Sequence, residues 1–282
     1  YNTAVGKQAL SANTTGGENV SPGWRSMFFN TTGARNTATG YQALYSNTTA
    51  SYNTAIGKDS LKATTTGQSN SGLGYKSMEA NTTGGSNTAL GYYALSANTT
   101  AGNNVAVGAD ALALNTTGAS NVAMGASALD ANTTGSSNVA IGWNSMTSNT
   151  TASENTAVGQ SSLGLNTTGA NNSAFGKGAL GANTTGYDNI AVGGYALDAN
   201  TTGVGNVAVG LFSLSTNTTA TGLTAVGQKT LRNSTGANNT AVGFEALTTN
   251  TTGSAGTAVG YRALTAVTTG SANTAVGYDA LR

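Results

Sequence analysis

One unit of 17 residues repeats along the whole chain and constrains the fold more than any other feature of the sequence. Its consensus is N-T-A-V-G-Y-x-A-L-x-A-N-T-T-G-x-x, and we number its positions 1 to 17 from Asn2. Copies begin at Asn2, Asn19, Asn36, Asn53, Asn70, Asn87, Asn104, Asn121, Asn138, Asn155, Asn172, Asn189, Asn206, Leu223, Asn239, Gly256 and Asn273, and the copy from Leu223 is one residue short. A unit this short cannot hold two helices and a turn, so it predicts one coil of a β-solenoid.

We therefore predict an all-β fold: a parallel β-solenoid (β-roll) with one 17-residue coil per repeat. It would form a single continuous domain over residues 1–282, with about 16.5 repeats. Short strands are expected at positions 2–4 and 9–14. Because the terminal repeats of a solenoid normally differ in order to cap it, and these do not, we expect the chain to belong to a longer fibre.

Charged residues make up only 7% of the chain, and all 21 of them fall at positions 6, 7, 10 or 17. This confinement marks the surface that faces water. A net charge of +1 gives no electrostatic reason to expect a nucleic-acid partner. No apolar run approaches the ~20 residues of a membrane span, so we expect no membrane insertion.

The sequence has no His and no Cys, which removes the usual metal ligands and the common nucleophile–base pairs. The acids sit singly on separate coils, and the glycines recur at a fixed period, unlike a phosphate-binding loop. We therefore expect no enzyme activity, no metal and no cofactor.

Position 5 is Gly in all 17 copies, which predicts a backbone corner with positive φ or no room for a side chain. In the second expected strand, strict alternation from the charged position 10 places Leu at 9, Ala at 11 and Thr at 13 inside. Met27, Met78 and Met146 replace Leu at position 9. The position-9 side chains should be the most buried.

Asparagine recurs at two positions, in 15 of 17 copies at position 1 and in 13 copies at position 12. Stacked Asn side chains can bond to one another and to turn backbone, which predicts asparagine ladders. At position 12 the sequence Asn-Thr-Thr is also an N-glycosylation acceptor, and an outward position 12 would make the amide accessible. Alternatively, the threonines serve β-propensity alone. The candidate glycosylation sites are Asn13, Asn30, Asn47, Asn81, Asn98, Asn115, Asn132, Asn149, Asn166, Asn183, Asn200, Asn217, Asn233 and Asn250.

Aromatic residues gather at position 6, which also accepts Lys and is therefore expected at the surface. Such rings could stack on sugars, or they could shield a corner or pack between chains. The candidate glycan-stacking residues are Trp24, Tyr41, Tyr75, Tyr92, Trp143, Tyr261 and Tyr278.

Position 4 carries Val, Ile, Leu, Met or Phe in most copies. If the strand alternates, position 4 shares the outward face of position 6 and forms an apolar stripe too large to leave in water. Burial against identical copies around a shared axis would resolve this, most simply in a homotrimer. Alternatively, Gly at position 5 turns position 4 inward, and the solenoid is a soluble monomer.

The core strings N-V-A-V-G (residues 104–108) and N-V-A-I-G (residues 138–142) resemble the S-V-A-I-G repeats of YadA-like head domains in trimeric autotransporter adhesins. The N-T-A-V-G-x-x-A-L arrays resemble those of phage-type tail-fibre repeat proteins. The resemblance implies a trimeric parallel β-roll in an extracellular fibre, although head coils of that family are a few residues shorter.

We therefore expect a structural or adhesive fibre shaft outside the cell, on a cell surface or a virion, with partner copies of itself and surface glycans. One alternative is a self-assembling extracellular matrix filament. Another is an ice-binding solenoid, which the adjacent threonines weaken because neighbouring residues point to opposite faces.

Overall fold

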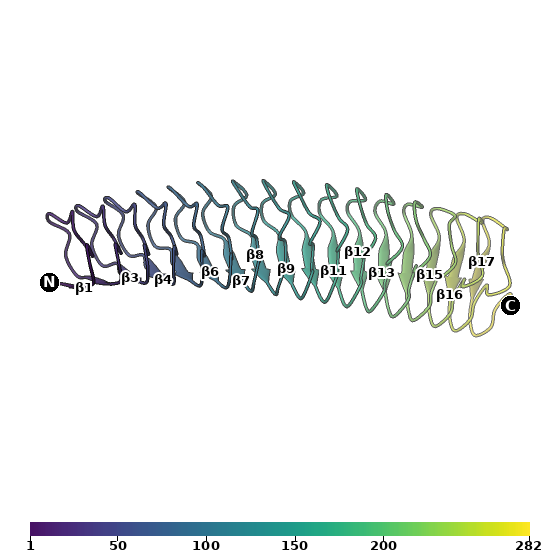
Figure 1. Ribbon diagram of the computed structural model, residues 1–282. Helices are drawn as coiled ribbons and strands as arrows, with labels where there is room; N and C mark the ends of the chain where they lie inside the picture. The colour runs from purple at the N-terminus through teal and green to yellow at the C-terminus, as the bar shows by residue number, and fades with distance from the viewer. The chain divides into compact units, whose positions relative to one another are not determined.

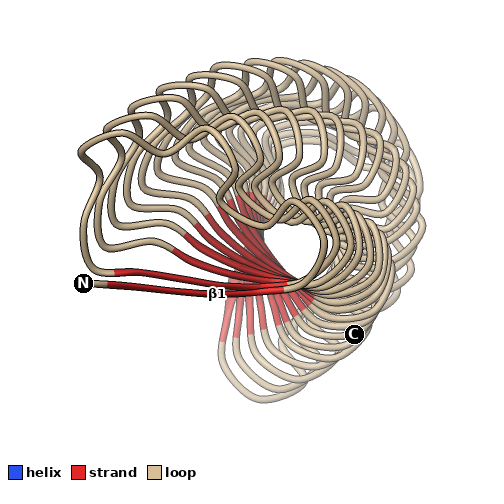
Figure 2. Ribbon diagram, turned by 60° about the vertical axis from the view of Figure 1, so that its left-hand side comes forward, coloured by secondary structure: helices blue, strands red, loops and turns tan.

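The computed structural model describes residues 1–282 and divides into two compact units, Tyr1–Ala140 and Ile141–Arg282. The fold is an all-β parallel solenoid of about 16 turns with about 17 residues per turn. Each coil contributes one short strand, and loops and turns make up the rest of the coil (Figures 1 and 2). The predicted fold class and coil length are confirmed; a single continuous domain stays a prediction.

Every strand lies at positions 2–4 of its repeat, and the first two extend by one residue. The strands are β1 (Asn2–Val5), β2 (Asn19–Pro22), β3 (Thr37–Thr39), β4 (Thr54–Ile56), β5 (Ser71–Leu73), β6 (Thr88–Leu90), β7 (Val105–Val107), β8 (Val122–Met124), β9 (Val139–Ile141), β10 (Thr156–Val158), β11 (Ser173–Phe175), β12 (Ile190–Val192), β13 (Val207–Val209), β14 (Thr224–Val226), β15 (Thr240–Val242), β16 (Thr257–Val259) and β17 (Thr274–Val276).

Consecutive strands pair in parallel, so that equivalent repeat positions lie side by side. In the first unit Ala38 of β3 pairs with Ala55 of β4, and in the second Ala157 of β10 pairs with Ala174 of β11. Thr224 of β14 pairs with Thr240 of β15, which is 16 residues on. The short repeat therefore loses its residue in the loops, and the register of the sheet is kept.

Each strand buries its middle residue and turns its two outer residues outward. From β3 to β17 the residue at position 3 is buried, while positions 2 and 4 are exposed or half-exposed. Leu73 and Leu90 at position 4, for example, are 45% and 44% exposed. The prediction that position 4 faces outward is confirmed, because the strand alternates as an extended chain must.

The glycine corner at position 5 is confirmed. Its φ lies between +125° and +156° in all 17 copies, a region that side chains of L-residues rarely adopt. In the first unit, a Cβ built on Gly108 would stand 2.5 Å from the carbonyl oxygen of Gly125 in the next coil. Both the backbone conformation and the stacking distance therefore require glycine.

The predicted second strand at positions 9–14 is wrong. Positions 7 and 9 adopt left-handed backbone conformations, as in Asp110 (φ 56°) and Leu112 (φ 52°), so the chain turns there instead of extending. From Met27 to Leu264, Leu and Met at position 9 are buried as predicted, with Leu112 and Met146 fully inaccessible. Position 11 points outward, since Leu114 is 57% exposed, and position 13 is half-exposed in most coils. The interior instead takes Ala or Ser at position 8 and Asn at position 12.

Candidate functional site

The asparagines at position 1 form a buried ladder that joins neighbouring coils. The backbone N–H of Asn36 donates to Oδ1 of Asn19 at 2.9 Å, and Nδ2 of Asn36 donates to the carbonyl of Ala50 at 2.9 Å. The same pattern recurs in most coils of both units, for example at Asn206. One side chain thus satisfies a donor of the next coil and the corner of its own coil, as the ladder prediction required.

The asparagines at position 12 form a second buried ladder. Nδ2 of Asn98 donates to Oδ1 of Asn81 at 2.8 Å and to the carbonyl of Ala101 at 3.0 Å. That carbonyl also accepts Nδ2 of Asn87 at position 1, so the two ladders meet at position 15. The carbonyl at this corner therefore faces inward, where only these amides can satisfy it.

The position-12 ladder is interrupted where the repeat departs from its consensus. Oδ1 of Asn47 and Oδ1 of Asn250 are buried without a hydrogen-bond partner. The next coil carries Thr64 after Asn47 and Val267 after Asn250, so neither offers an amide. An isolated replacement in a ladder thus leaves a neighbour unsatisfied, which is costly in a buried position.

The prediction that position 12 is accessible to N-glycosylation is wrong for nearly all the candidate asparagines. Twelve of them are buried: Asn30, Asn47, Asn81, Asn98, Asn115, Asn132, Asn149, Asn166, Asn183, Asn200, Asn217 and Asn250. Asn13 is half-buried. The left-handed turns at positions 7 and 9 rotate position 12 inward, contrary to the alternation assumed from the sequence. Only Asn233 is exposed, because in the short repeat Ser234 takes the inward place. A glycan on Asn233 stays a prediction.

The threonine pair after this asparagine has a structural role that the sequence left open. The position-13 hydroxyl donates to a carbonyl in the next coil, as from Thr31 to Thr48 at 2.9 Å and from Thr184 to Thr201 at 3.0 Å. The position-14 threonines face solvent in most coils. The first threonine therefore joins coils, and the second forms part of the outer surface.

The position-6 aromatic residues lie at the surface, where most of them stack on a ring of the next coil. Trp24 and Tyr41 stack with their centroids 4.7 Å apart, Tyr75 and Tyr92 at 5.4 Å, and Tyr261 and Tyr278 at 5.0 Å. Trp143, 55% exposed, has no aromatic residue at position 6 of either adjacent coil. Stacked rings have at least one face occupied already, and Tyr261 stacks on both Phe244 and Tyr278. Sugar binding by this set stays a prediction.

Charged side chains pair mainly along and between the loops of the outer surface. Arg35 and Glu18 lie 3.0 Å apart, and this hydrogen bond raises the pKa of Arg35. Glu245 receives both Lys229 and Arg262, at 3.5 and 3.0 Å. Asp59 departs from the expected solvent map, because its residue is only 4% exposed; Lys62 lies 3.2 Å from its carboxylate. These pairs are mostly at the surface, so each contributes little to stability.

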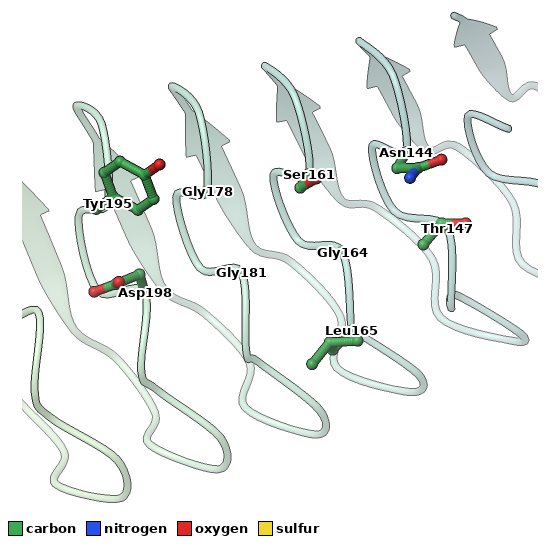
Figure 3. Close-up of a pocket in the computed structure, with 9 residues that line it drawn as sticks. All are labelled: Asn144, Thr147, Ser161, Gly164, Leu165, Gly178, Gly181, Tyr195 and Asp198. Atoms are coloured by element: carbon green, nitrogen blue, oxygen red, sulfur yellow. The ribbon is translucent and has the colours of Figure 1, made fainter. Parts of the chain in front are cut away.

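A hollow of about 300 Å³ opens on the loops of the second unit, where several coils carry small residues at positions 7 and 10. Figure 3 shows its lining in two rows that run across four coils. One row holds Asn144, Ser161, Gly178 and Tyr195, and the other holds Thr147, Gly164, Gly181 and Asp198, with Leu165 beside them. The sequence analysis did not predict this site. Glycines at positions 7 and 10, where most coils carry a side chain, could have indicated a hollow there.

At one end of this hollow, burial raises the pKa of the Asp198 carboxyl, outweighing the opposing effects of nearby backbone N–H groups and Arg232. Its Oδ1 is buried without a hydrogen-bond partner. Because the folded chain binds this proton more tightly than the unfolded chain, the stability it contributes is fully present below the unfolded pKa, about 3.9. That stability is lost as the pH rises through the raised folded pKa.

We therefore expect Asp198→Asn to raise the melting temperature at pH 7, because the neutral amide avoids burying a charge. The difference from wild type should shrink as the pH falls from 7 through the raised folded pKa to about 3, because below the unfolded pKa of about 3.9 the wild-type carboxyl is protonated in both states. Thermal unfolding of both proteins followed by circular dichroism between these pH values checks this. A lower melting temperature for the variant at pH 7 would contradict the assignment.

Two further features bear on the class of site. No group of three or more His, Cys, Asp or Glu side chains is placed to hold a metal ion. The chain also forms no helix of the length and apolar character needed to cross a membrane.

The fold and the ladders define the class of this protein: it is a β-solenoid of about 17-residue repeats with asparagine ladders. No protein-family model and no curated protein matches the chain.

Proposed function

We propose that this chain is a structural fibre shaft that assembles with copies of itself, most simply as a homotrimer, outside the cell on a virion tail or a cell surface. The observation that carries the proposal is the strand face, which we define as the outward side chains at positions 2 and 4 of the strands.

The strand face is uncharged throughout. None of the 17 coils places a charged residue at position 2 or 4. Large apolar side chains lie on it in both units, including Leu73 at 45%, Leu90 at 44%, Phe175 at 42% and Ile190 at 43% exposed. A surface that exposes an apolar side chain at position 4 of every coil except that of Thr39, with uncharged residues at position 2 and every charge elsewhere on the coil, suits the core of an interface.

The strand face also contains a hollow that a side chain of another surface could fill. In the first unit a hollow of about 210 Å³ opens between β5 and its neighbours, beside Leu73, Leu90 and Thr88. Gly72 stands at position 3 there, where the repeat usually has Ala. An apolar side chain of a second copy fits such a hollow, because Leu73, Ala89 and Leu90 give it apolar walls.

The area of the strand face suits an association between copies. At 3.3 Å per residue and 4.8 Å per strand, the eight strands of one unit present about 380 Å². Each unit by itself thus supplies about half of the ~800 Å² per partner of a standard protein interface. A closed arrangement around a shared axis would bury this face while positions 7, 10 and 17 stay in water.

The resemblance to YadA-like head repeats and to phage-type tail-fibre repeats supports the extracellular, trimeric version of this proposal. The solenoid would act as a spacer, and a partner such as a surface glycan would bind along its outer loops. An open filament of the extracellular matrix is the second candidate, and it differs in that its assembly would not close.

Light scattering on the purified chain tests the assembly. We expect about three times the chain mass of 27.7 kDa for wild type. The double variant Leu73→Lys with Leu90→Lys should dissociate to a monomer, because it places charges in the interface while both side chains are already exposed. The control Leu114→Lys changes a leucine that is 57% exposed and lies away from the strand face, and it should stay trimeric.

Two other results of the same measurement would contradict the trimer. A dilute, well-behaved wild-type monomer would show that the strand face stays in water. A mass that grows with concentration without limit would instead favour the open matrix filament.

A further inference from the structure

We propose that the hollow on the loops of the second unit is a binding site for one neutral pyranose ring of a glycan, with Tyr195 as its stacking platform. The proposal concerns the surface of a single chain and does not depend on assembly. A monomeric result for the whole chain would leave it standing.

The hollow exists because the ladders of outward side chains at positions 7 and 10 are interrupted together. Tyr195 and Phe212, at position 7 of neighbouring coils, stack with centroids 5.5 Å apart and planes 9° apart. The preceding coils carry Gly178 and Ser161 at the same position, and Gly181 and Gly164 at position 10. Two consecutive coils thus lack the large side chains that would continue the ring stack.

The Tyr195 ring bounds this gap. Phe212 covers one face of the ring, and the ring reaches from its own coil over Gly178 (Figure 3). A Cβ built on Gly178 would stand only 2.9 Å from Cδ1 of Tyr195, so glycine is what permits this pose. A flat ring bound against Tyr195 above the small residues would extend the stack by another member.

The polar groups of the lining favour a sugar over an apolar side chain. The Tyr195 and Ser161 hydroxyls border the gap and can donate and accept hydrogen bonds; the Asn144 amide can do the same at the far end of the hollow, three coils or about 14 Å from Tyr195. None of the three side chains makes a hydrogen bond within the protein. Sugar hydroxyls also donate and accept, whereas a purely apolar ligand would strip water from these groups without replacing it.

The size and charge of the hollow fit one ring. A volume of about 300 Å³ holds about ten water molecules, which suits a hexopyranose and is at the lower end for small-molecule sites. Asp198 is the only charged residue in the lining itself, and Lys177 Nζ lies 6.0 Å from the centroid of the Tyr195 ring, so charges of both signs border the hollow and neither an anionic nor a cationic ligand is favoured. A neutral pyranose combines an apolar face for Tyr195 and Leu165 with hydroxyls for the polar groups.

Saturation-transfer NMR with methyl glucoside, methyl galactoside and methyl mannoside, each at millimolar concentration, tests the site on the full chain. We expect transfer to the ring protons of at least one glycoside. Tyr195→Ala should weaken that binding about tenfold, since it removes the stacking platform. Gly181→Tyr should abolish it by filling the hollow.

The repeat supplies matched controls for both variants. Position 10 already carries Tyr45 and Phe28 in other coils, so a tyrosine at 181 is compatible with the fold. Ala113→Tyr also places a tyrosine at position 10, but in a coil of the first unit, and Tyr93→Ala removes a position-7 ring from that unit. Both controls should bind the glycoside as wild type does.

Three outcomes would overturn the proposal. One is no transfer to any of the three glycosides from wild-type protein. Another is transfer that persists unchanged in Tyr195→Ala and Gly181→Tyr. The third is transfer to phenol that is lost in both variants while no glycoside binds, because the hollow would then be a site for aromatic side chains.

Discussion

Replacing Leu112 with Asp is expected to destabilise the first unit by about 5 kcal/mol or more. Leu112 is fully buried at position 9, where the interior is one side chain deep. The substitution loses the apolar burial of a leucine and places a carboxylate where no cation can reach it. Chemical denaturation followed by circular dichroism measures the loss, and hydrogen exchange of the amides in residues 104–120 locates it.

Leu114→Asp is the matched control for this experiment. It makes the same chemical change two residues along in the same coil, at a side chain that is 57% exposed. Its effect should stay within about 0.5 kcal/mol, as for most surface substitutions. Equal denaturation midpoints for the two variants would show that position 9 is not the core of the coil.

Replacing Gly193 with Ala is expected to cost about 3 kcal/mol. Gly193 has φ of 127°, and a Cβ there would stand 2.8 Å from the carbonyl oxygen of Gly210 in the next coil. In the variant, alanine would adopt an unfavourable backbone conformation, and its Cβ would push the backbone of Gly210 away. The register of the stacked coils prevents that backbone from moving easily. The melting temperature and the denaturation midpoint report the change.

The adjacent residue provides the comparison. Gly194 at position 6 has no positive φ, and a Cβ there would meet only Cδ1 of Leu211 at 3.3 Å. Other coils already have alanine at position 6, as at Ala109 and Ala126. We expect Gly194→Ala to be neutral or to stabilise by about 0.5 kcal/mol through the unfolded chain. A loss at Gly194 as large as at Gly193 would mean that the corner glycine has no special role.

The sequence by itself determined the coil, because a strict period of 17 residues stacks each residue type on itself. The invariant glycine at position 5, the strand at positions 2–4, the buried leucine at position 9 and the position-1 asparagine ladder all follow from that repetition. The outward phase of position 4 also followed, because an extended strand has a side-chain period of two. These are local properties of one coil, and because every coil repeats them, only a stack of equivalent coils satisfies all of them.

Only the tertiary structure decided what happens between positions 6 and 14. Leucine is not typical of the left-handed conformation that Leu112 adopts at position 9. The alternation rule therefore assumed an extended chain, and it misplaced Asn at position 12 and Ala at position 11. Stacking on the next coil is what holds these residues there, through contacts between residues 17 apart. The hollow beside Tyr195 has the same origin: it arises from small residues on successive coils, which adjoin only once the chain is coiled.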